Sequence, residues 1–194
     1  MGRVADGSTL ALFSVHQRDA TIDARERFAH QLTGVARPDL LVVATCHRVE
    51  IAAALPLDAD AAAELAERLR VELPPQGTLR TGGDAILHLL RVACGLDSVV
   101  TGEGQILGQL RRAFETALEA GGLEPSLALL VRRAIELGRE LRRTTALGSV
   151  RRSLGSLAVD AALEGLTEPE DAAVLVVGAG EVGKLALRAR ARAG

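Results

Sequence analysis

Cys46 is the side chain of this sequence best suited to covalent chemistry. It follows the apolar run 40–44 and stands in the polar segment Thr45-Cys46-His47-Arg48. The run predicts a buried strand, and the thiol is expected in the loop at the end of that strand. A cationic neighbour, either Arg48 or a protonated His47, favours the thiolate, which attacks acyl carbons to give thioesters. A buried structural cysteine is the competing interpretation.

A glycine-rich loop near the other end of the chain predicts a dinucleotide site. The apolar run 174–177 indicates a buried strand, GAGEVG follows it at 178–183, and residues 184–193 have a helical pattern. In a Rossmann unit such glycines permit the tight turn, admit the pyrophosphate and let the helix pack on the strand, and the helix N-terminus binds phosphate. A tight turn without a ligand is the alternative. The residue that would contact the ribose of the cofactor and distinguish NAD from NADP lies beyond Gly194. Since the Rossmann unit is incomplete, we expect the chain to be a fragment of a longer protein.

Two polar helix faces lie between these motifs. His88 shares a face of the predicted helix 83–94 with Arg91, while Gln105, Gln109 and Arg112 follow each other at helical spacing in 105–120. A structural histidine and a solvated glutamine face are the open alternatives to catalysis and binding. Cys94 lies in an apolar stretch and is predicted to be core.

Composition fits a globular cytoplasmic protein. Of 194 residues 48% are hydrophobic and 25% are charged, and the net charge of −2 gives no overall attraction to nucleic acid. Nine arginines against five glutamates over 111–152 are either an RNA-facing surface or a solvated helix face. The two cysteines are too few for a disulfide framework or a zinc site, no apolar run approaches the ~18 residues of a membrane span, and the N-terminus has no signal pattern.

Hydrophobic periodicity predicts the elements that must position these residues. Strands are expected over 9–16, 40–44, 49–55 and 174–177, and helices over 21–32, 58–72, 83–94, 105–120, 125–144, 153–166 and 184–193. The predicted fold class is α/β. We divide the chain into an α+β N-terminal catalytic domain (1–150), a connecting helix and linker (151–172), and the start of a Rossmann-type parallel sheet domain (173–194).

Taken together, these segments resemble the glutamyl-tRNA reductases over residues 9 to 194. ATCHRVEI at 44–51 is similar to the family's nucleophile motif S/A-T-C-N-R-x-E-x, and HLLRVACGLDS at 88–98 to its H-L-x-x-V-A-x-G-L-D-S. GEGQILGQ at 102–109 is similar to G-E-P-Q-I-L-G-Q, GAGEVG at 178–183 to the family's G-A-G-E-x-G cofactor loop, and ARER at 24–27 to its L-R-E-R. Two positions depart from the pattern: His47 stands in place of Asn, which puts a titratable ring beside the nucleophile, and Gly104 stands in place of Pro.

The resemblance implies NADPH-dependent reduction of glutamyl-tRNA(Glu) to glutamate-1-semialdehyde through a cysteine thioester, the first step of tetrapyrrole (porphyrin) biosynthesis from glutamate. It implies that Cys46 is the nucleophile and His88 a general acid or base, and that Arg48 binds the substrate carboxylate through a charge-assisted fork. The implied substrate positions are Thr45, His47, Arg48, Ser98, Glu103, Gly104, Gln105 and Gln109. The implied NADPH positions are Gly178, Ala179, Gly180, Glu181, Val182 and Gly183.

No metal is implied. The implied partners are glutamyl-tRNA, glutamate-1-semialdehyde aminomutase as a candidate, and a second subunit bound through a C-terminal domain outside this chain. We expect the 194-residue chain to retain acyl transfer and to lack NADPH-dependent reduction. Two alternatives remain at this point: a non-catalytic tRNA-binding or regulatory fragment, and a nucleotide-binding protein with an incidental thiol.

Overall fold

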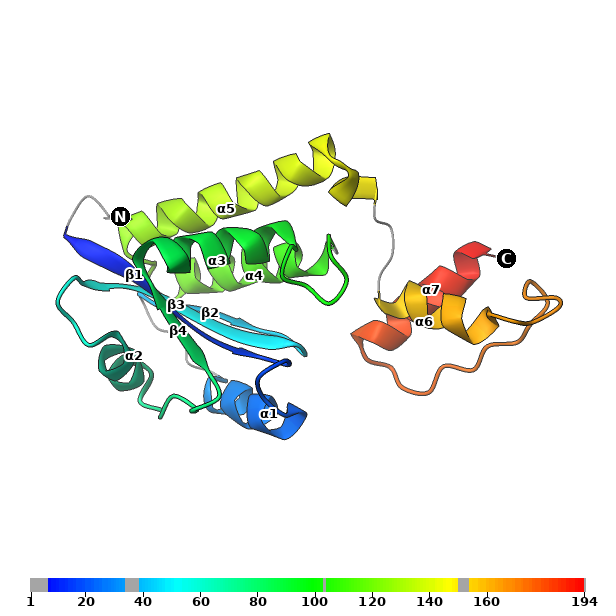
Figure 1. The fold of residues 1–194 in the computed structure, drawn as a ribbon, viewed down its shortest axis with the longest axis horizontal. Coiled ribbons are helices and arrows are strands. Elements are labelled where there is room, and N and C mark those ends of the chain that lie inside the picture. Colours follow the sequence, from blue (N-terminus) through cyan, green and yellow to red (C-terminus); the bar gives the residue numbers. More distant parts are fainter. Residues whose placement is uncertain (1–6, 34–38, 103, 150–153, 194) are drawn as a thin grey trace.

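A four-stranded antiparallel sheet organises the N-terminal part of the protein (Figure 1). The computed structural model describes residues 7–33, 39–102, 104–149 and 154–193. The strand order is β2-β3-β1-β4. The strands are β1 (Ser8–His16), β2 (Leu41–Ala44), β3 (Arg48–Pro56) and β4 (Thr78–Thr81). The mixed α/β class predicted from the sequence is confirmed.

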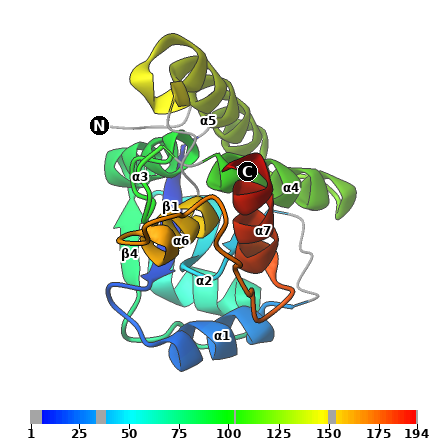
Figure 2. The same cartoon turned by 90° about the vertical axis from the view of Figure 1, so that its right-hand side faces the viewer.

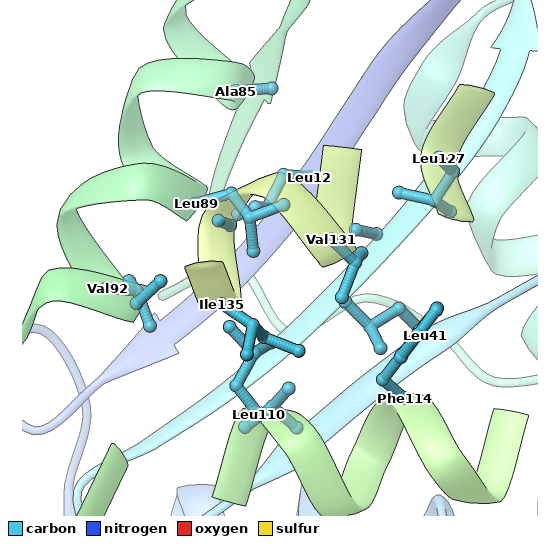
Figure 3. Packing of buried hydrophobic residues seen from close by; sticks show 14 of the residues in the cluster. Leu12, Leu41, Ala85, Leu89, Val92, Leu110, Phe114, Leu127, Val131 and Ile135 are labelled. Atoms are coloured by element: carbon cyan, nitrogen blue, oxygen red, sulfur yellow. The ribbon is translucent and has the colours of Figure 1, made fainter. Parts of the chain in front are cut away.

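Helices cover both faces of this sheet because its central strands are apolar on both sides. α1 (Ile22–Gln31) and α2 (Ala61–Leu69) pack on one face, and α3 (Gly82–Cys94), α4 (Gln105–Glu119) and α5 (Pro125–Thr144) pack on the other (Figure 1). Alternation along β1 sends Leu10 and Leu12 toward α3, α4 and α5, and Phe13 toward α1. Figure 3 shows side chains of the three-helix face meeting those of the sheet.

Capping residues fix where several helices begin and end. Thr21, the first residue of the predicted helix 21–32, accepts a hydrogen bond from the N–H of Ala24 at the start of α1, and Asp60 caps α2 in the same way. α2 is shorter than the predicted range 58–72 at both ends, because Asp60 caps its start and Arg70, with a φ of +57°, ends it. α3 ends at Gly95, which has a φ of +74°.

A glycine permits the close crossing of α3 and α5. An ideal Cβ placed on Gly138 of α5 would lie 2.6 Å from the carbonyl oxygen of Ala93 in α3. A side chain at this position would therefore push the two helices apart.

The C-terminal part contains a pair of helices, α6 (Leu154–Leu163) and α7 (Glu181–Ala193), which follow a short 3-10 turn at Ala146–Ser149. The two helices pack closely, since a Cβ at Gly155 of α6 would lie 2.5 Å from the main-chain nitrogen of Ala186 in α7. Figures 1 and 2 show the pair beside the sheet and its helices, and Figure 2 looks onto its outer side.

One strand prediction was wrong, and one strand was not predicted. The predicted buried strand 174–177 is an irregular extended segment in which the side chains of Leu175 and Val177 are 87% and 90% exposed. A parallel strand needs neighbouring strands to pair with its main chain and layers to cover both faces, and no such neighbour lies beside it among the described residues. The edge strand β4 was not predicted, because its four residues are mostly exposed and lack an apolar alternation.

Candidate active site

Cys46 lies at the tip of a tight turn between two strands. β2 ends at Ala44 and β3 begins at Arg48, and the N–H of Thr45 donates to the carbonyl oxygen of Arg48 over 2.8 Å. The Thr45 hydroxyl accepts hydrogen bonds from the main-chain N–H groups of His47 and Arg48 at 3.2 and 3.1 Å. Cys46 is exposed, which contradicts the interpretation of a buried structural cysteine. Cys94, by contrast, is 2% exposed in the core, as predicted.

The imidazole of His47 is the nearest titratable group to the thiol. Its Nδ1 lies 3.3 Å from the Cys46 Sγ, and its Nε2 lies 3.9 Å away. A neutral ring with Nδ1 unprotonated accepts the thiol proton, and a protonated ring holds the thiolate by charge. The departure from the family's Asn therefore places a proton acceptor in contact with the predicted nucleophile.

Hydrogen bonds from α1 and from the segment that connects β1 to α1 stabilise the turn. The Arg25 guanidinium, 6% exposed overall, donates to the carbonyl oxygens of Ala20 at 2.7 Å and Cys46 at 3.2 Å. The N–H of Gln17 donates to the carbonyl oxygen of His47 over 2.9 Å. Arg25 was not predicted as a site residue. The only sequence signal was its place in the ARER segment, which gave no indication that it contacts Cys46.

Buried charged groups lie on the three-helix face of the sheet, next to the turn. The strand register pairs His16 with Arg48 and Ser14 with Glu50. The Arg48 guanidinium donates to Glu50 Oε1 at 3.2 Å and to Asp97 Oδ2 at 3.0 Å, and it also donates to the main-chain carbonyl of Asp97. Its Nη2 lies 3.2 Å from His16 Nε2.

His88 of α3 belongs to the same buried group. Its Nε2 lies 3.0 Å from each carboxylate oxygen of Glu50, so this carboxylate stands between His88 and Arg48. Glu50, Asp97 and His16 were not predicted as site residues. The signal available for Glu50 was its i,i+2 spacing from Arg48 on a strand, which places both side chains on one face.

Burial and neighbouring charges shift two pKa values in this group. Burial lowers the pKa of His16, and the positive charges of Arg48 and Arg18 lower it further. Burial on its own would raise the pKa of Asp97, but the hydrogen bond from Arg18 and the charges of both arginines outweigh it and lower that pKa. The group is thus arranged around an ionised Asp97 and an uncharged His16.

The two residues for which the resemblance implied the most specific roles lie differently: Arg48 lines the small pocket that also includes Cys46, whereas His88 does not. Arg48 is 2% exposed and both its terminal nitrogens are engaged by protein groups, so a substrate carboxylate would have to displace Asp97 or Glu50. His88 lines a separate pocket with Asp97 that does not include Cys46. Arg48 thus reaches the pocket beside Cys46 while it is held by Asp97 and Glu50, and His88 connects to it only through Glu50.

The remaining implied substrate residues meet Cys46 on the side of α4. Ser98, Gln105 and Gln109 line a small pocket with Cys46 and its turn, and Gly104 lines an adjoining one. Glu103 lies outside the described residues. The small pocket has a volume of about 20 Å³, which is roughly the space of one water molecule. Side chains must therefore move to admit a glutamyl group there, whereas the adjoining pocket, which also borders Cys46, Gln105 and Gln109, has a volume of about 750 Å³.

The glycine loop has the backbone features expected for a pyrophosphate site. Gly178 has a φ of +111°, and a Cβ at Gly183 would lie 2.6 Å from the carbonyl oxygen of Gly178. A Cβ at Gly180 would meet no atom within 4 Å, so the main chain is open to a ligand there. Ala179 is exposed, as is Val182, and α7 begins at Glu181, whose side chain is outside the described set. The loop fits a dinucleotide even though the strand before it is not formed.

Among the described residues, no group of three or more His, Cys, Asp or Glu side chains is placed to hold a metal ion. None of the helices in the described ranges has the length and apolar character needed to cross a membrane.

The comparisons with known proteins agree on one family. A sequence model described as "Glutamyl-tRNAGlu reductase, N-terminal domain" matches residues 10–145. The glutamyl-tRNA reductase of Methanopyrus kandleri is 40% identical over 144 residues, covering 74% of this chain and 34% of the relative, and that of Myxococcus xanthus is 36% identical over 192 residues, covering 95% and 43%. A solved structure of glutamyl-tRNA reductase from Methanopyrus kandleri superposes with a TM-score of 0.64 at 30% identity, covering 95% of this chain and 47% of that one. The chain thus spans less than half the length of these relatives.

Proposed function

The chain belongs to the glutamyl-tRNA reductase family, and from this membership we propose that it carries the acyl-transfer site at which Cys46 takes a glutamyl group from glutamyl-tRNA. The observation that carries the proposal is the exposed Cys46 thiol, 3.3 Å from the imidazole of His47 and next to Ser98, Gln105 and Gln109. A structural cysteine has no need of such neighbours.

The proposed step exchanges an oxygen ester for a thioester. The Cys46 sulfur forms a bond to the acyl carbon, and the bond between that carbon and the terminal ribose oxygen breaks, with the bonding electrons leaving on the oxygen. His47 accepts the thiol proton at Nδ1 and returns it to the ribose oxygen, as in other cysteine–histidine pairs. The products are a glutamyl thioester on Cys46 and free tRNA.

Reduction of the thioester to glutamate-1-semialdehyde is the proposed activity of the enzyme as a whole. Bound NADPH would supply a hydride to the thioester carbon. The residues that would hold its pyrophosphate are Gly178, Ala179, Gly180, Glu181, Val182 and Gly183; this assignment is supported by the first and last glycines, which shape the turn, and by the middle one, which leaves the main chain open. When the carbon–sulfur bond breaks, the Cys46 sulfur leaves as a thiolate and recovers a proton, for which His47 is the nearest donor.

We propose positioning roles for the buried charged residues. The Glu50 carboxylate joins His88 to Arg48, and Arg48 begins the strand that follows the catalytic turn. His88 therefore influences activity through Glu50 and the base of the turn, without contact with the reacting carbon.

The test is capture of the acyl-enzyme. We expect the protein mixed with glutamyl-tRNA and quenched in acid to gain the mass of one glutamyl residue, and a peptide map to place the added mass on Cys46. Cys46→Ser should abolish the labile thioester, whereas Cys94→Ser, which changes the buried thiol, should leave it.

Binding of the glutamyl-tRNA without acylation of Cys46 would refute acyl transfer and would favour a tRNA-binding or regulatory module. Equal labelling of Cys46→Ser and the parent protein would also refute it, because the acyl group would then reside elsewhere.

A further inference from the structure

His16, the last residue of β1, has both of its ring nitrogens next to hydrogen-bond donors. Its Nδ1 lies 3.1 Å from the main-chain nitrogen of Arg18 and 3.2 Å from the Nε of the same residue. Its Nε2 lies 3.2 Å from Nη2 of Arg48, its partner in the strand register. His16 is 7% exposed, so the ring depends on these two arginines for its hydrogen bonds.

A neutral imidazole cannot accept hydrogen bonds from both arginines at the same time. One ring nitrogen carries a lone pair and the other carries a hydrogen, whereas arginine only donates. With the lone pair at Nε2 the ring accepts from Arg48, and with the lone pair at Nδ1 it accepts from Arg18. A protonated ring would present hydrogens to donors on both sides, which agrees with the lowered pKa of His16.

The other charged groups around the ring do not remove this competition. Arg18 lies 2.7 Å from Asp97 Oδ1. Arg48 donates through Nη1 to Glu50 and Asp97, and through Nη2 to the main-chain carbonyl of Asp97. Each arginine therefore keeps an anionic partner in either form of the ring. Because the bond from Arg48 to neutral His16 is not an ion pair, it can break without separating opposite charges.

We infer that His16 is a positioning residue that holds or releases Arg48 according to which of its ring nitrogens carries the proton. Arg48 lines the small pocket beside Cys46, so an N–H of Nη2 released by His16 becomes available to an anionic group that enters this pocket. Such an anion would in return favour the form of the ring that accepts from Arg18, because the coupling between two binding events is reciprocal. The inference rests on the proposed function only for the identity of the entering group, a glutamyl chain.

The first experiment follows the ring of His16 in the parent protein. NMR spectra of histidine labelled at its ring nitrogens show which nitrogen is protonated. Cys46 is alkylated with iodoacetate, which leaves a carboxylate on the sulfur, or with iodoacetamide, which leaves a neutral amide of similar size. We expect both neutral forms of the ring with the amide adduct. With the carboxylate adduct, the ratio of the form protonated at Nε2 to the other should rise about threefold, the effect of one hydrogen bond. An unchanged ratio, or a single form in both adducts, would overturn the inference.

The second experiment uses two substitutions that keep opposite contacts. Along the side chain, the carbonyl oxygen of asparagine is as far from Cβ as Nδ1, and that of glutamine is as far as Nε2. His16→Asn should therefore keep the contact with Arg18 and release Arg48, whereas His16→Gln should keep Arg48 held.

The measured quantity is the rate of Cys46 alkylation by anionic iodoacetate divided by the rate with neutral iodoacetamide, because this ratio cancels a general change in thiol reactivity. We expect it to be about threefold or more higher in His16→Asn than in His16→Gln, with the parent protein between them. His30→Asn and His30→Gln at the exposed end of α1 are matched controls and should leave the ratio unchanged. Equal ratios in the two His16 variants, or the reverse order, would show that the ring does not control Arg48.

Acylation by glutamyl-tRNA separates this inference from the proposed function. We expect His16→Gln to raise the half-saturating concentration of glutamyl-tRNA about threefold with little change in the maximal rate, and His16→Asn not to raise it. If the parent protein is not acylated while the alkylation ratios and ring populations change as expected, the proposed function is wrong and the role of His16 remains. If the parent protein is acylated but the two variants have equal alkylation ratios, the role of His16 is wrong and acyl transfer remains.

Discussion

Replacing Glu50 by Gln tests whether the buried charged residues support the turn that carries Cys46. The Arg48–Glu50 pair has side chains that are 3% and 6% exposed, and the carboxylate also faces His88 at 3.0 Å. The amide keeps one oxygen as an acceptor but removes the negative charge from between Arg48 and His88. Breaking a buried ion pair from one side typically costs about 3–5 kcal/mol. Because Asp97 remains bound to Arg48 at 3.0 Å, we expect a loss at or below the lower end of that range, at about 2–3 kcal/mol.

An exposed ion pair in the same protein provides the matched control. Arg111 and Glu115 on α4 lie 3.6 Å apart and are 53% and 56% exposed. Glu115→Gln makes the same chemical change where solvent screens the charges, and should cost about 0.5 kcal/mol or less. The difference between the two variants is therefore about 2 kcal/mol, or roughly 30-fold in the unfolding equilibrium constant.

Urea denaturation at neutral pH, followed by circular dichroism, measures this difference. We expect Glu50→Gln to lower the midpoint strongly, Glu115→Gln to leave it nearly unchanged, and both to keep the same dependence on urea concentration. If Glu50→Gln costs no more than Glu115→Gln, the buried residues around Arg48 do not stabilise the fold, and the positioning roles proposed for them are wrong.

Three further predictions concern the thiol, the pH dependence of stability and helix packing. His47→Asn should slow alkylation of the exposed thiol at neutral pH by about threefold or more, because the ring at 3.3 Å no longer accepts the proton; an unchanged rate would mean that the imidazole does not act on the sulfur. The pKa of Asp97 is held below its ordinary value of 3.8, so its contribution to stability is present above about pH 4 and is lost as the pH falls further; the melting temperature of Asp97→Asn should therefore decline less on acidification than that of the parent protein. Gly138→Ala should cost about 2 kcal/mol in urea denaturation, since its Cβ would lie 2.6 Å from a carbonyl oxygen of α3; a neutral result would show that the helices can separate freely.

Local sequence patterns predicted most of the secondary structure. The predicted helix 125–144 matches α5 residue for residue, and the predicted helix 21–32 contains α1, because amphipathic spacing is a property of a few neighbouring residues. β4 and the segment 174–177 depend on which strands lie beside them, and the sequence nearby does not contain that information. The error at 174–177 came from treating an apolar run as proof of a sheet around it.

The candidate site was likewise predicted only in the part that depends on neighbouring residues. The exposed Cys46 and its contact with His47 follow from a tight turn between two strands, which the sequence indicated. The ion pair between Arg48 and Asp97 joins residues 49 positions apart. It forms only because the loop after α3 packs against the sheet, so the sequence around either residue did not predict it. Arg25 was missed for the same reason, because its contact with the Cys46 carbonyl exists only once α1 is packed.

The irregular segment 174–177 has a practical consequence for anyone who purifies this protein. Its main chain is not part of a sheet among the described residues, and the aliphatic side chains of Leu175 and Val177 project into solvent. An exposed extended segment of this kind can pair with a strand of a neighbouring molecule. Concentrated samples are therefore expected to self-associate through this stretch, and a protease is expected to cut there before it reaches the hairpin that carries Cys46.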